Sequence, residues 1–182
     1  MWKSFRIKRS FCLFLLSLSM CSLMLTVGTT LNAQGLPNLK HIKLNKKAHF
    51  KDNEGLALKV TDYIFATPID HKNDSRRQAG QFLIRWMNGT PDYVFFLGEK
   101  ETTYFDTDTE LMLVYMAGLT RFCLQHKSVT DPRQRTLGAL QLALPYLDKQ
   151  ENKKRWSVQL WQLMDAYKNG KLAAFLEEEE TN

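Results

Sequence analysis

Apolar residues recur at helical spacing in five segments between residues 52 and 168, and this periodicity limits the fold more than any other feature of the chain. One such stripe contains Ala79, Phe82, Leu83 and Trp86. Positions i, i+3, i+4 and i+7 share one face of a helix, and that face has to be buried against other elements. The sequence therefore predicts an all-α fold, a single-domain bundle or short helical array of about five helices.

Capping and helix-breaking residues set the expected boundaries. A proline or an Asn-Gly pair ends a helix, whereas Asp or Thr before an apolar run begins one. We expect helix ends at Thr67-Pro68, Asn88-Gly89 and Asn169-Gly170, and helix starts at Thr107, with Glu110 as its capping partner, and at Asp131-Pro132. The helix that follows Thr107 is apolar over a wide arc, which predicts a central position. The last of the five is expected from Lys153 to Lys168, and Pro145 predicts a kink or an early stop in the fourth.

Residues 92–105 break the helical pattern. Two stretches rich in aromatic and β-branched residues, 93–97 and 102–105, flank a four-residue loop that contains Gly98. This arrangement predicts a minor β-hairpin or, without ladder pairing, an extended segment. Tyr93 and Phe95 are candidates for contact with a flat ligand, although aromatic residues in a small domain more often belong to its core.

The N-terminus has the order of a secretory signal. Four basic residues precede an apolar run from Phe11 to Val27, which gives way to small and polar residues. We expect residues 1–33 to be a signal peptide cleaved near Ala33-Gln34, which places the protein in the periplasm or outside the cell. Two alternatives remain open. The apolar run is long enough for an uncleaved membrane anchor, and Cys21 could carry a lipid.

Charge divides the remaining chain into three parts. Residues 34–51 form a lysine-rich arm that we expect to be flexible, 52–176 a helical domain, and 177–182 an acidic tail that frays at its helix end. The arm contains Lys40, Lys43, Lys46, Lys47 and Lys51 and no acidic residue. Such an arm can make weak contact with an anionic membrane surface. Removal of residues 1–33 leaves 21 basic and 19 acidic residues, a balance that does not suggest a nucleic-acid partner.

Few residues suggest chemistry. Cys123 and His126 are three apart on an expected helix, within reach of each other as a nucleophile and a base, but the sequence around Cys123 is apolar. Asp108 and Glu110 lie where a helix begins, where capping and the helix dipole favour acidic residues without any catalytic role. The four histidines are scattered and no paired cysteines remain after Ala33, so we expect no metal site and no cofactor.

The sequence thus favours an exported helical binding or interaction module without catalytic residues, whose partner is another envelope or extracellular protein. One alternative is an envelope-associated hydrolase with a site formed only in three dimensions. Its polar residues would come from a dispersed set, Asp62, Arg85, Glu110 and Arg121. A second alternative is a membrane-tethered protein, held by an uncleaved signal or by a lipid.

Overall fold

The structure, a computed structural model, describes residues 35–95 and 97–181 and, within α9, side chains only as far as Glu178. The signal peptide expected at 1–33 lies outside these residues. In the part described, the chain forms α-helices and one short 3₁₀ helix, η1, and no strand, which confirms the all-α class. The elements are η1 (Leu39–His41), α2 (Lys47–Asp52), α3 (Glu54–Ala66), α4 (Asp74–Gly89), α5 (Glu99–Phe105), α6 (Thr109–Gln125), α7 (Pro132–Asp148), α8 (Val158–Lys168) and α9 (Leu172–Thr181).

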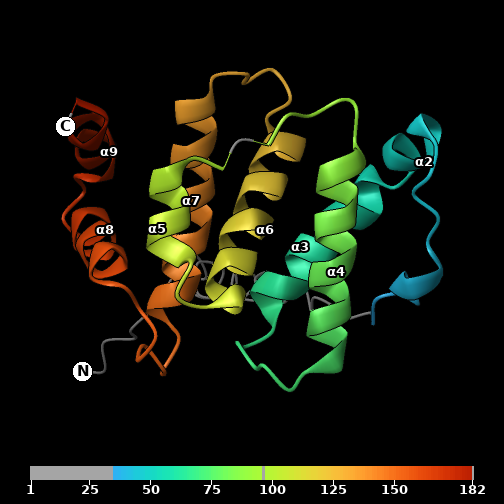
Figure 1. Cartoon of the computed structure of the whole chain (residues 1–182), viewed down its shortest axis with the longest axis horizontal. Coiled ribbons are helices and arrows are strands. Elements are labelled where there is room, and N and C mark those ends of the chain that lie inside the picture. The colour runs from blue at the N-terminus through green and yellow to red at the C-terminus, as the bar shows by residue number, and fades with distance from the viewer. Residues whose placement is uncertain (1–34, 96, 182) are drawn as a thin grey trace, which may run out of the picture. The chain divides into compact units, whose positions relative to one another are not determined.

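The helices lie side by side in a row that does not follow their order in the chain (Figure 1). At one end η1 and α2 lie beside α4, and α3 lies between α4 and α6. At the other end α8 contacts α5 and α7, and α9 contacts α8. The predicted central helix is α6, which contacts α3, α4, α5 and α7 and buries most of its residues. The array, rather than a closed bundle, leaves two outer helical faces at its ends.

The closest packing joins α6 to α7. A Cβ atom on Gly118 would lie only 2.6 Å from the carbonyl oxygen of Ala139, and one on Gly138 would lie 2.1 Å from the ring of Phe122. Each helix thus has a glycine where the other approaches, because any side chain there would hold the two backbones apart. Leucines and alanines of both helices are buried in the core.

The prediction of about five helices was too low for the described residues, which form eight α-helices. The additional helices are α2, within the lysine-rich arm, α5, and α9, which runs through the segment expected to be an acidic tail. The arm also contributes Leu39 and Phe50 to the core. Two buried apolar side chains flanked by lysines are too few to give a periodic pattern, so sequence periodicity could not identify these elements.

The hairpin predicted at 92–105 is wrong. Its second half is helix α5, and in its first half the described residues, 92–95 and 97–98, have irregular or extended backbone. Packing overrides the β propensity of Thr102 and Thr103, because the Phe105 ring stacks on that of Tyr115 in α6, with centroids 5.0 Å apart. Within the helix the hydroxyls of Thr102 and Thr103 donate to the carbonyls of Gly98 and Glu99, four residues earlier, so that both hydroxyls are hydrogen-bonded.

Most expected boundaries hold. Asp131 caps α7 by accepting a hydrogen bond from the Gln134 amide at 2.9 Å, and α8 ends at the Asn169-Gly170 pair, where Gly170 has a φ of 69°. At the end of α4, in contrast, Gly89 does not take the left-handed conformation. Its lack of a side chain instead makes room for the Phe50 ring, which a Cβ would approach to 2.2 Å. The proline in α7 does not stop the helix, which continues from Pro145 to Asp148.

Two helix starts differ from expectation. The N-cap of α6 is Asp108 rather than Thr107, and it accepts from the Glu110 amide at 2.8 Å. The last long helix begins at Val158, not near Lys153, because Ser157 caps it by accepting from the Leu160 amide. Among the described helices, none combines the length and the apolar character needed to cross a bilayer.

Candidate functional site

A polar cleft with a volume of about 480 Å³ lies where the loop after α3 meets the loop after α7. Its volume falls within the usual range of small-molecule sites. Ionisable side chains at its wall are His71, Asp108, Lys149, Glu151 and Arg155, and its apolar lining is Pro68, Ile69, Leu111 and Trp156. The Ile69 amide donates to the Gln150 side chain at 3.2 Å, so the two loops are joined directly.

Asp108 is the carboxylate at the centre of this cleft. Its Oδ1 caps α6, while its Oδ2 lies 3.2 Å from both His71 Nε2 and Arg155 Nη1. The Asp108 side chain is 5% exposed, whereas those of His71 and Arg155 are 46% and 63% exposed. A buried acid therefore holds two solvent-facing basic side chains at the mouth of the cleft. This arrangement can orient His71 as a proton acceptor, and it also ties both loops to the start of α6.

A buried ion pair fixes the helices that carry the cleft. Arg76 in α4, fully buried, donates from Nε to Glu110 at 2.5 Å. Its Nη1 donates to the carbonyls of Ile64 and Thr67 at the end of α3, at 2.7 and 3.0 Å. One guanidinium thus joins the end of α3, the start of α4 and the start of α6. Of the two acidic candidates, Asp108 reaches the cleft and Glu110 serves this internal junction.

The structure does not support a cysteine nucleophile. Cys123 is 1% exposed, and burial raises the pKa of its thiol, which favours the unreactive protonated form. His126 is exposed, and its ring packs against Phe122 with centroids 4.5 Å apart. The two candidates therefore lie in different environments, one in the core and one at the surface.

Tyr93 and Phe95 belong to an aromatic cluster around Trp86. The three ring centroids lie 5.9 to 6.1 Å from one another, a spacing typical of packed aromatic side chains. The Tyr93 hydroxyl donates to Glu54 at 3.3 Å, and Lys127 contacts the same carboxylate. Burial raises the pKa of Tyr93, with the nearby Glu54 carboxylate adding to the effect. These contacts attach the irregular segment before α5 to α3 and α4.

The dispersed polar set suggested for a hydrolase does not form one group. Asp62 pairs with Arg121 at 2.9 Å, across α3 and α6. Arg85 instead donates to the Leu39 carbonyl at 3.1 Å and holds η1 against α4. With Glu110 paired to Arg76, each member has a separate local partner.

A second concave surface, the α8–α9 groove, has a volume of about 630 Å³. It is lined by Val158, Trp161, Gln162, Asp165, Ala166, Asn169, Lys171, Ala174, Phe175 and Glu178. Two large apolar side chains stand open to solvent there, Trp161 at 48% and Val158 at 68% exposed. The apolar periodicity of the sequence does not identify this surface. Its signal was present in Trp161, an aromatic residue outside the apolar stripe of the predicted fifth helix.

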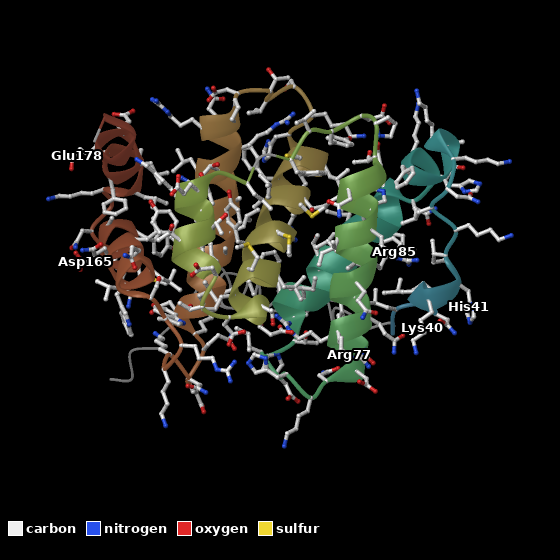
Figure 2. All side chains as sticks on the ribbon, viewed as in Figure 1. Lys40, His41, Arg77, Arg85, Asp165 and Glu178 are labelled. Carbon is white, nitrogen blue, oxygen red and sulfur yellow. The ribbon has the colours of Figure 1, made fainter. Side chains whose placement is uncertain are left out.

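A smaller hollow of about 430 Å³, the η1–α4 groove, lies at the opposite end of the row. Its apolar lining is Ile84 above the buried Leu39 and Phe82, and its charged lining is Lys40 and Arg85. Ile84 is 40% exposed. All five lysines of the arm are exposed around this end of the molecule. Figure 2 shows Lys40 and Arg85 at this end and Asp165 and Glu178 at the other.

Metal ligands do not gather in the residues that the structure describes, since no group of three or more His, Cys, Asp or Glu side chains is placed to hold an ion. Comparison with known proteins adds no assignment. No protein family, curated protein or solved structure matches this chain.

Proposed function

We propose that this chain is an exported binding module that engages another protein through the α8–α9 groove. The observation that carries the proposal is the exposure of Trp161 and Val158 in a concave surface at the end of the row. Tryptophan is the residue type most often found to dominate protein–protein binding energy, particularly where a pocket surrounds it. A large apolar side chain on a concave outer face is better explained by a partner than by stability.

The packing of α8 shows that Trp161 is not needed to bury this helix. Leu160, Leu163 and Met164 already form its buried face, each at 2% exposure or less. Trp161 lies off that face, with its ring 4.6 Å from that of Trp156. Lys153 lies over the Trp156 ring at 4.9 Å, a cation–π contact that helps hold the pair in place. The Trp161 ring therefore packs against Trp156, while about half of the Trp161 side chain remains open to solvent.

Charge around the groove limits the kind of partner. Asp165 and Glu178 line it together with a single base, Lys171. The four consecutive glutamates of residues 177–180 extend the negative character along α9. A segment with one or two apolar side chains flanked by basic residues fits such a surface, because its charges complement the rim while its apolar groups cover Trp161.

Site-specific photo-crosslinking tests the proposal. A photoreactive amino acid at position 161 should form a discrete covalent adduct in the cells that export the protein, and mass spectrometry then identifies the captured chain. The matched control carries the same group at Gln159, which is exposed on α8 but outside the groove. Absence of a 161-specific adduct would overturn the proposal.

The exported location is part of the same proposal and rests on residues 1–33 of the sequence. The mass of the protein recovered from the cell envelope tests it. Loss of those residues supports a released module. An intact N-terminus, or an added lipid, would instead support the membrane-tethered alternative.

A second candidate function, hydrolysis, has one specific observation in its favour, the contact between His71 and Asp108 in the polar cleft. A histidine held by a buried carboxylate can accept a proton from water. No hydroxyl or thiol side chain lines the cleft within the described residues, so this candidate function takes water, activated by His71, as the nucleophile. Turnover of a hydrolase substrate panel that His71→Gln abolishes would support this function. Turnover that is absent, or unchanged in the variant, would exclude it.

A further inference from the structure

We infer that the partner of the α8–α9 groove is the η1–α4 groove of a second copy of this chain, so that the protein assembles head to tail. This inference rests on the proposed function and names its partner. It follows from a comparison of the two ends of the row, whose grooves carry opposite charges beside an exposed apolar side chain.

The two grooves offer opposite charges beside apolar surface. The α8–α9 groove has two acids and one base, Asp165, Glu178 and Lys171, beside the exposed Trp161. The η1–α4 groove has two bases and no acid, Lys40 and Arg85, beside the exposed Ile84. Each groove therefore offers the other an exposed apolar side chain that is bordered by charges of the opposite sign.

The flanking sequence extends this polarity in the same sense at each end. Residues 34–51, which include η1 and most of α2, contain five exposed lysines and no acid, and the first acid after them is Asp52 at the end of α2. Glutamates 177–180 occupy α9 without a base among them. Opposite charges of this size at the two ends of one molecule steer copies toward an end-to-end encounter and oppose contact between two like ends.

The geometry determines the class of assembly. The contact is heterologous, because different surfaces of the two copies meet, and each copy keeps one groove unoccupied after the first contact. Further copies can then be added, so that the average particle size should rise with protein concentration. A symmetric pair formed by two identical grooves would instead stop at a dimer.

Sedimentation velocity on the processed protein, with its N-terminus verified by mass, tests the inference. The weight-average sedimentation coefficient should increase with concentration at low salt and increase less at high salt, since the attraction is partly screened. Trp161→Ala should weaken the self-association about tenfold or more. Lys59→Glu, a charge reversal at an exposed position of α3 outside both grooves, should leave it unchanged.

A mixing experiment isolates the head-to-tail geometry. Trp161→Ala disables only the α8–α9 groove, and Lys40→Glu disables only the η1–α4 groove. Each variant alone should stay monomeric. Mixed in equal amounts they should form dimers and nothing larger, because one intact groove of each kind remains and can meet the other. Circular dichroism of each variant verifies that the fold is retained.

Three results would overturn the inference. They are a wild-type protein that stays monomeric at every concentration, self-association that the groove variants leave intact, and mixed variants that fail to pair. A different result would assign the basic end to a membrane instead. In that case the wild type stays monomeric and binds anionic lipid vesicles, and Lys40→Glu loses the vesicle binding. If position 161 still captures a different protein in cells, the proposed function stands without self-assembly. If it captures nothing, both fail.

Discussion

The α6–α7 pair and the α8–α9 pair use apolar residues in opposite ways. Between α6 and α7 the backbones come so close that a Cβ on Gly118 would lie 2.6 Å from the Ala139 carbonyl oxygen. Between α8 and α9 a groove remains, and Trp161 stays 48% exposed in it. The comparison indicates that the stability of the fold resides in its centre, while the outer pair has apolar surface left over for binding.

The largest effect should come from breaking the buried ion pair that attaches α4 to the central helix. Glu110→Ala leaves the Arg76 guanidinium buried without its carboxylate partner, so we expect a loss of about 3–5 kcal/mol in the free energy of unfolding. Urea denaturation measures it. Arg77→Ala removes only an exposed contact with Asp74 and should cost less than about 1 kcal/mol. Equal losses in the two variants would mean that the central junction is not special.

A smaller effect is expected from Gly118→Ala, which adds one methyl group where α6 meets α7. We expect a loss of about 1–3 kcal/mol, because the helices must separate although alanine itself favours a helix. Gly55→Ala is the matched control, since nothing lies within 4 Å of the Cβ it would add in α3. The control should be neutral or stabilising in thermal and urea unfolding. A neutral Gly118→Ala would show that the α6–α7 contact can adjust.

The centre should also respond to alkaline pH. Burial raises the pKa of the Cys123 thiol above its ordinary 9.0 and that of the Tyr115 phenol above its ordinary 10.0. The unfolded chain loses these protons at lower pH than the folded one. The free energy of unfolding should therefore fall as pH rises past about 9, by at most about 1.4 kcal/mol per pH unit for each group.

Urea unfolding at several pH values from neutral to alkaline checks this expectation. The slope of stability against pH should be shallower in Cys123→Ala and unchanged in Trp161→Ala, which lies in the outer pair. A wild type with constant stability across that range would contradict a buried, protonated thiol in α6.

The smallest effect on stability is expected from Trp161→Ala. Because about half of this side chain is exposed, we expect a loss of at most about 1 kcal/mol, even though the same change should weaken binding about tenfold or more. Trp86→Ala provides the contrast, since that indole is fully buried and donates to the Phe50 carbonyl at 2.9 Å, and about 3–5 kcal/mol should be lost. Similar losses in thermal unfolding would erase the distinction between the two regions.

Apolar periodicity predicted the all-α class and the central helix, and capping residues such as Asp131 predicted several helix ends. Both kinds of prediction succeed because helical stripes and caps involve residues only a few positions apart in the sequence. The prediction failed for α5, where the β propensity of Thr102 and Thr103 was outweighed by the contact of Phe105 with Tyr115 in another helix. Short helices such as α2 bury too few residues to produce a pattern at all.

For the candidate sites, too, the sequence predicted what depends on nearby residues and missed what depends on contacts between distant ones. Asp108 was identified as an acidic residue at a helix start, which is a local property, but its contacts with His71 and Arg155 join residues far apart in the chain. Cys123 and His126 are neighbours on the sequence pattern of a helix, yet one is buried and the other exposed. Trp161 stands out only when the faces of α8 that are already covered have been identified.

The order of the amino acids by itself determined that the chain forms amphipathic helices, that its basic and acidic runs lie at opposite ends, and that its first 33 residues resemble an export signal. Only the tertiary structure decided which helices touch, which carboxylates are buried and which apolar residues remain uncovered. The physical reason is that helix formation and capping depend on groups a few residues apart, whereas burial depends on contacts between segments distant in sequence.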